Sequence, residues 1–270
     1  MQSQQKFSVG EILQTAWGNL RTDPMALLER AGLPVLLSAL VSVVVSLYFP
    51  GDLRLDGTTD TSDPAFAEAV AGLLPIVLIG AGISLILIVT FSVAWYRHIL
   101  IRDPKEAGWL AIRWDSARTN FLFRFVGLAL LAIGSAFPAG LLPQLIGLPP
   151  VVSFVVMLLV PITIFSRLCL CLPGTAIGDS VTFADSWRMT RGQTMNMAVV
   201  AVLSLIPTFV ISLVVLTIAS TILGMVGVVQ TLTATFVLSV LSESIVYTGY
   251  GFQAGAIAEA YKRLKSREIE

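Results

Sequence analysis

Two charged residues, Arg167 and Glu243, lie inside long apolar stretches and are the first candidates for chemistry. Each lies about fifteen to seventeen residues from the outer end of the membrane span predicted for its segment. At about 1.5 Å per residue, both side chains therefore lie at a similar depth, in the inner half of the membrane. An isolated charge at the centre of a membrane helix costs at least about 2.5–3.5 kcal/mol, which predicts an intramembrane Arg167–Glu243 ion pair. Two interpretations stay open: a structural clamp, or part of a proton, ion or lipid path.

A second pattern places a Trp four residues before an Arg, and it occurs three times. The pairs are Trp17 with Arg21, Trp114 with Arg118, and Trp187 with Arg191. Residues at i and i+4 share one helix face. At a membrane surface the indole lies at headgroup depth while the guanidinium reaches lipid phosphate. The pattern predicts interfacial contacts with lipid or with a partner at three equivalent sites; plain anchoring of surface helices is the alternative.

Other reactive side chains give no catalytic or metal site. The single histidine, His98, has no identifiable partner that would make it a general base. Cys169 and Cys171 are one residue apart, a spacing that suits neither a mutual disulfide nor, without further ligands, a metal site. We therefore predict no catalytic residue, no metal and no cofactor, and we expect the chain not to be an enzyme.

The elements that carry these residues are predicted to be membrane helices. Hydrophobic residues make up 56% of the 270 and charged residues 13%, against about 25% charged in soluble domains. A helix needs about 20 apolar residues to cross a bilayer. Apolar stretches of this length predict an all-α polytopic bundle of six transmembrane helices in one membrane domain, 1–270. The predicted spans are 31–49, 69–96, 122–143, 150–173, 197–219 and 228–250.

The orientation follows from Lys and Arg, which are enriched in cytoplasmic loops. Under six spans nearly all of them fall on one side, and Arg54 stands alone on the other, in a loop rich in Asp. This distribution predicts a multi-pass protein of a bacterial inner (cytoplasmic) membrane, with both the N- and the C-terminus in the cytoplasm.

The recurring Trp–Arg pattern also predicts a threefold tandem repeat, with units at about 8–96, 103–173 and 180–260. Each unit would be an amphipathic interfacial helix followed by a transmembrane hairpin. Ser8 with Glu11 forms a capping box at the first of the three interfacial helices, and Thr182 with Asp185 forms a looser one at the third.

Two segments resemble an uncharacterised family of bacterial six-span membrane proteins, which are similar to the membrane domain of glycerophosphodiester phosphodiesterases. They are Phe7–Trp17 and Leu172–Gly192. In the full-length enzymes of that family, catalysis belongs to a separate soluble domain, and no such domain is found in this sequence. The resemblance therefore implies a six-span module near glycerophospholipid metabolism, without the enzymatic activity.

We expect a non-enzymatic membrane protein that acts as an accessory or scaffold subunit, or that binds lipid headgroups. Its expected partners are membrane lipids and other membrane proteins, and no nucleic acid. The alternative is a small transporter or channel that uses a polar intramembrane site around Glu243 and Arg167. A water-accessible cavity that reaches Glu243 would favour the alternative.

Overall fold

The computed structural model describes residues 7–48, 64–102, 114–226 and 231–269, and these residues are helical almost throughout. The helices are α1 (Val9–Thr22), α2 (Pro24–Tyr48), α3 (Pro64–Leu100), α4 (Ser116–Leu145), α5 (Pro150–Leu168), α6 (Cys171–Ala176), α7 (Phe183–Met189), α8 (Thr194–Met225) and α9 (Leu232–Ile269). Six stretches are long and apolar enough to cross a membrane: α2, α3, α4, α5 with α6, α8 and α9. The all-α fold with six candidate spans is thus confirmed.

The helices extend beyond the predicted spans. The charged segment after residue 250 stays helical, and α9 runs on to Ile269. The fourth predicted span is interrupted after Leu168 and continues as the short helix α6. The second predicted interfacial helix falls mainly on 103–113, which lies outside the described residues.

Local signals explain where several helices begin. The Asp115 side chain accepts a hydrogen bond from the backbone N–H of Arg118 and caps α4. Thr182 and Asp185 form the capping box that was expected at α7. Between α4 and α5, Gly147 adopts a φ of +78°, a conformation that glycine tolerates without strain, and Pro150 opens α5.

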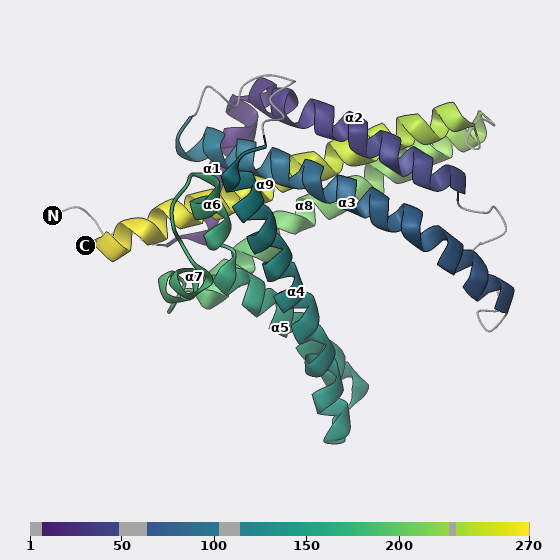
Figure 1. The fold of residues 1–270 in the computed structure, drawn as a ribbon. Coiled ribbons are helices and arrows are strands. Elements are labelled where there is room, and N and C mark those ends of the chain that lie inside the picture. Colours follow the sequence, from purple (N-terminus) through teal and green to yellow (C-terminus); the bar gives the residue numbers. More distant parts are fainter. Residues whose placement is uncertain (1–6, 49–63, 103–113, 227–230, 270) are drawn as a thin grey trace.

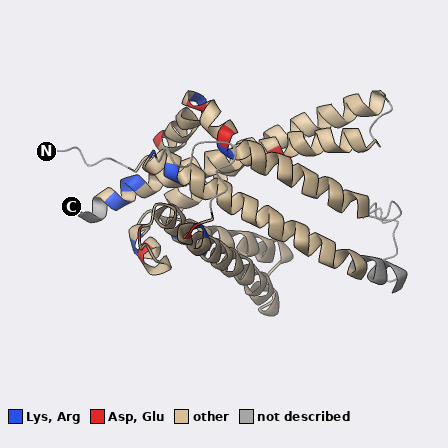
Figure 2. Ribbon diagram, turned by 45° about the horizontal axis from the view of Figure 1, so that its top comes forward, with Lys and Arg blue, Asp and Glu red and all other residues tan. Residues whose placement is uncertain are grey.

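The spans form three antiparallel hairpins, α2–α3, α4–α5 and α8–α9, that start and end near the chain termini (Figure 1). Helix α9 packs against α1, α2, α3 and α8, whereas the α4–α5 hairpin diverges from the others (Figure 1). The shorter helices α1, α6 and α7 lie at the end where both termini lie, which we call the hub. Among the described residues, charged side chains gather at the hub, and the parts of the hairpins far from it are nearly free of them (Figure 2).

The core also lies at the hub. Its fully buried members include Ile12 of α1, Trp95 of α3, Cys171 of α6 and Tyr261 of α9. The indole N–H of Trp95 donates to the carbonyl of Gly251 at 2.8 Å and joins α3 to α9. In lipid, helices associate through close packing and interhelical hydrogen bonds, and each such bond contributes about 0.6 kcal/mol on average.

Candidate functional site

The tryptophans of the three Trp–Arg pairs are all partly exposed. Trp17 lies on α1, Trp187 on α7, and Trp114 two residues before α4. Their exposed fractions are 47%, 45% and 45%. Large, rigid and half-exposed indoles at the charged end of a membrane bundle match the interfacial position that tryptophan favours.

The arginines of these pairs are not equivalent. Arg21 and Arg191 are exposed, but Arg118 is fully buried. The Arg118 guanidinium lies 3.5 Å from the Asp115 carboxylate, which also accepts a hydrogen bond from Arg97 at 2.8 Å. The prediction of three equivalent contact sites is therefore wrong at Arg118, because the N-cap carboxylate of α4 holds this side chain inside the protein.

Arg167 stacks on the tryptophan of the third pair, Trp187 of α7. Its guanidinium carbon lies 4.1 Å from the centre of the Trp187 ring, a cation–π geometry. Its Nε–H donates to the hydroxyl of Thr194 at 2.8 Å, and Ser186 donates to its backbone carbonyl. These contacts place the side chain beside α7 and the start of α8, at the hub end of α5.

Glu243 lies on a different interface, between α9 and α2. Its carboxylate accepts a hydrogen bond from Ser42 at 3.3 Å. One turn away, the hydroxyls of Ser38 and Tyr247 are 3.0 Å apart. Two serines four residues apart on α2 thus face two polar residues four residues apart on α9. Both spacings are visible in the sequence, but the contact between the two helices was not predicted.

The predicted Arg167–Glu243 ion pair is not formed. Arg167 is on α5, which packs against α4, α7 and α8, whereas Glu243 is on the side of α9 that packs against α2. Similar depth in the membrane is not sufficient for contact, because the two side chains lie on different helix–helix interfaces. Each is stabilised by local partners instead.

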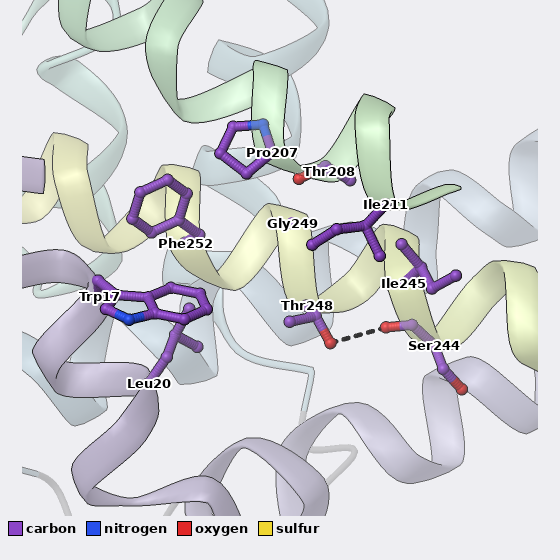
Figure 3. Close-up of a pocket in the computed structure, with 10 residues that line it drawn as sticks. All are labelled: Trp17, Leu20, Pro207, Thr208, Ile211, Ser244, Ile245, Thr248, Gly249 and Phe252. Atoms are coloured by element: carbon purple, nitrogen blue, oxygen red, sulfur yellow. Dashed lines mark hydrogen bonds between the residues drawn. The ribbon is translucent and has the colours of Figure 1, made fainter. Parts of the chain in front are cut away.

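An apolar groove lies between α1, α8 and α9, and we call it the α1–α8–α9 groove (Figure 3). Its cavity volume is 280 Å³. The lining residues are Trp17, Leu20, Pro207, Thr208, Ile211, Ser244, Ile245, Thr248, Gly249 and Phe252. Trp17 and Phe252 meet edge to face at the hub end, with ring centres 6.0 Å apart.

Helices α8 and α9 come very close beside this groove, at Thr208 and Gly249. A Cβ atom added at Gly249 would lie 2.2 Å from the Thr208 hydroxyl oxygen, so glycine is required for this crossing. No local pattern in the sequence predicts the groove, because it is formed by three helices from opposite ends of the chain. The small residues of α9 were its only sequence signal.

The hub contains several ionised contacts outside the spans. Burial works against the charged carboxylate of Asp179, yet hydrogen bonds from Lys265 and Tyr261 keep its pKa below the usual value. At Asp115, hydrogen bonds from the Arg118 backbone and from Arg97 likewise outweigh burial and lower the pKa.

The partly exposed Asp185 has a pKa lowered to about 2, through hydrogen bonds from Thr182 and Arg188. Both Asp185 and Asp179 lie in the segment between the fourth and fifth spans. Carboxylates that are held in this way remain ionised at neutral pH and tie the connecting segment together.

His98 and the two cysteines occupy structural positions. His98 lies 3.3 Å from the Asp23 carboxylate and packs on the Trp95 ring. Cys169 and Cys171 are buried as free thiols. Within the described ranges, no group of three or more His, Cys, Asp or Glu side chains is placed to hold a metal ion.

Comparison of the chain with protein families, with curated proteins and with solved structures finds no match. The resemblance to the membrane domain of glycerophosphodiester phosphodiesterases stays a prediction. Any functional assignment therefore depends on the geometry of the sites described above.

Proposed function

We propose that this protein is a non-enzymatic module of the cytoplasmic membrane that binds phospholipid headgroups at its hub. The observation that carries the proposal is the pairing of the Arg167 guanidinium with the half-exposed Trp187 ring. An indole at headgroup depth with a guanidinium beside it is suited to a lipid phosphate.

Arg167 has donors left for such a phosphate. Among the described residues, the hydrogen bond that its guanidinium donates is the one from Nε–H to Thr194. The terminal N–H groups of the planar fork therefore remain for an anionic ligand, and arginine binds phosphate through two parallel hydrogen bonds. Arg21 and Arg191, both exposed, would supply further positive charge at the same end.

The membrane and the orientation belong to the same proposal. The distribution of Lys and Arg favours the cytoplasmic membrane with both termini inside. Single cysteines at Arg188 and Gln144, both exposed positions, would test this orientation. A membrane-impermeant maleimide added outside intact cells should label Gln144→Cys and spare Arg188→Cys; the reverse pattern would invert the topology.

The headgroup proposal is tested by lipid retention. We would purify the full chain in mild detergent, add phosphatidylglycerol or phosphatidylcholine, and count bound lipids by native mass spectrometry. Arg167→Gln should lower phosphatidylglycerol binding about tenfold, because a hydrogen bond to a charged group contributes about 1.5–3 kcal/mol.

Arg188→Gln is the matched control. It removes the same charge from the neighbouring helix α7, but Arg188 is ion-paired with Asp185 and 73% exposed. If both variants keep the wild-type lipid complement, the headgroup proposal is wrong. A stoichiometric membrane protein that co-purifies and is displaced by Arg167→Gln would instead indicate an accessory or scaffold subunit.

A second candidate is a small transporter that uses Glu243. It is favoured by the ladder of Ser38, Ser42, Glu243 and Tyr247 between α2 and α9. On the α8 side of α9, a separate groove of 490 Å³ is lined by several hydroxyls, Ser242 among them, and its lining does not include Glu243. A pH-dependent flux in liposomes that Glu243→Gln abolishes would support this function over lipid binding.

A further inference from the structure

The α1–α8–α9 groove has walls suited to hydrocarbon. None of its lining residues is charged, and most are aliphatic or aromatic. Two of its hydroxyls are already used within α9, since Ser244 donates to the Val240 carbonyl and Thr248 to the Ser244 carbonyl (Figure 3). A polar ligand would find few free partners here, whereas an alkyl chain needs none.

The size and direction of the groove fit one alkyl chain. Along α9 it extends from Ser244 to Phe252, which is about 12 Å at about 1.5 Å per residue. It starts at Trp17, at the charged end of the molecule, and runs toward the uncharged hairpin ends (Figures 2 and 3). A volume of 280 Å³ holds on the order of nine groups the size of a water molecule, so a chain segment fits lengthwise.

The charge at the Trp17 end of the groove indicates which chemical group the bound alkyl chain carries. Arg21 follows Trp17 by one helical turn and is exposed, so it extends from the same face of α1. The nearest acidic residue in the chain, Asp23, is engaged elsewhere: it accepts from the backbone N–H of Ala26 and lies 3.3 Å from His98. The mouth is thus marked by a cation, which complements a phosphate.

We propose that the groove binds one acyl chain of a phospholipid from the leaflet at the hub, with the lipid phosphate near Arg21 and the chain between Pro207 and Phe252. This inference rests on the proposed headgroup function and extends it with a second site at the hub, where Arg21 would hold the head and the groove the tail of the same lipid. Trp17 covers the glycerol region, and the crossing of Gly249 with Thr208 forms part of the groove wall.

A photoreactive lipid tests this inference. The full chain is reconstituted in phosphatidylcholine vesicles with a small fraction of phosphatidylglycerol that carries a diazirine in mid-chain. After illumination, cross-linked peptides are mapped by mass spectrometry. We expect adducts concentrated on residues 207–211 and 244–252.

Thr248→Phe should reduce these adducts about tenfold, the change expected when roughly two methylene groups lose an apolar site. Thr221→Phe on α8 is the matched control, because Thr221 is also lipid-exposed and also bonds a carbonyl in its own helix, outside the groove. The smaller Thr248→Leu gives a second variant, with an intermediate reduction, if the phenylalanine variant does not fold.

Several outcomes would overturn the inference. Adducts spread evenly over all lipid-facing helices, or unchanged by Thr248→Phe, mean that the groove is not a chain site. A cross-linked polypeptide in place of lipid means that a partner helix covers it. The Arg167→Gln variant separates failure of the groove from failure of the proposed function. It can keep the groove adducts and lose headgroup selectivity, or it can lose the groove adducts and keep headgroup selectivity.

Discussion

The hub and the outer half of the α4–α5 hairpin are held together differently. At the hub, Trp95 and Tyr261 are buried almost completely and both make hydrogen bonds to other segments. In the outer hairpin, Phe137 and Leu145 are 74% and 79% exposed. There, α4 and α5 pack mainly on each other (Figure 1).

This difference indicates where the protein itself supplies the stability. In lipid, helices associate through close packing and hydrogen bonds and not through the hydrophobic effect. The hub has both, whereas the outer hairpin is apolar on nearly every face and depends on the bilayer around it. Substitutions at the hub should therefore destabilise the bundle, and comparable substitutions in the outer hairpin should not.

The largest effect is expected from Asp115→Ala. The change removes the N-cap of α4, a hydrogen-bond acceptor of Arg97 and a carboxylate beside the buried Arg118. Loss of one partner of a buried ion pair destabilises by about 3–5 kcal/mol, and the partial exposure of Asp115 moves the expectation to the low end. Thermal unfolding in detergent, followed by circular dichroism, measures it.

Asp185→Ala is the control for this prediction. Asp185 and Arg188 are also three residues apart, but the arginine is 73% exposed. An exposed pair contributes about 0–1 kcal/mol, and the lost capping interaction adds about 1 kcal/mol. Equal destabilisation by the two variants would contradict the assignment of a special role to the buried pair.

A comparison of glycines is expected to give the next largest effect. In Gly249→Ala the new methyl group would lie 2.2 Å from the Thr208 oxygen, and overpacking of this kind costs about 1–3 kcal/mol. Gly134→Ala, in the outer part of α4, meets nothing within 4 Å and should be neutral or slightly stabilising, since alanine favours helix by about 1 kcal/mol. Thermal stability in detergent measures both.

Thr208→Ala should restore much of the stability that Gly249→Ala loses, since it removes the atoms in conflict. Without such a rescue, the two residues would not be in the close contact that defines the α8–α9 crossing. The double variant thus tests a single contact at the hub side of the bundle.

The number and order of the spans could be predicted from the sequence because hydrophobicity is a property of continuous segments. The turn at Gly147 was predictable for the same reason, since glycine and proline act locally. The Arg167–Glu243 prediction failed because depth along a helix does not say which helices pack on each other. Ser42, the true partner of Glu243, is 201 residues away in sequence.

The candidate site was predictable only in part. The exposed Trp17 and Trp187 follow from the interfacial pattern, but the burial of Arg118 depends on how Asp115 caps α4. The groove beside Trp17 depends on three helices meeting. No local pattern encodes such a meeting.

A smaller, pH-dependent effect is expected at Asp179. Its pKa is depressed in the folded state, so the contribution to stability is complete above the unfolded value near 3.8 and is lost as the pH falls through the folded pKa. Asp179→Asn should therefore destabilise by about 1 kcal/mol at pH 7. The deficit should shrink as the pH falls below 4.

Melting curves of Asp179→Asn and the wild type from pH 7 to pH 3 give this measurement. Lys265→Gln, which removes one of the donors to Asp179, should show the same convergence at low pH. A deficit that is constant over the whole range would mean that the hydrogen bonds to Asp179 do not depend on its charge.

The smallest expected effect is a coupling energy close to zero between Arg167 and Glu243. Their partners are separate, Thr194 and Trp187 for the arginine and Ser42 for the glutamate. Arg167→Gln and Glu243→Gln should each destabilise the protein, and their effects should add within about 0.3–0.5 kcal/mol, as they do for independent sites.

Glu243→Gln with Ser42→Ala is the positive control for this double-mutant cycle, because these side chains are in direct contact. That pair should be non-additive by about 0.5 kcal/mol or more. If Arg167 and Glu243 coupled as strongly as Glu243 and Ser42 do, the two charges would meet in some state of the bundle. The α4–α5 hairpin, with little packing in its outer half, would then have to move toward α9. The hub would be the fixed part of the bundle, and the hairpin would be a moving part instead of one that the lipid holds in place.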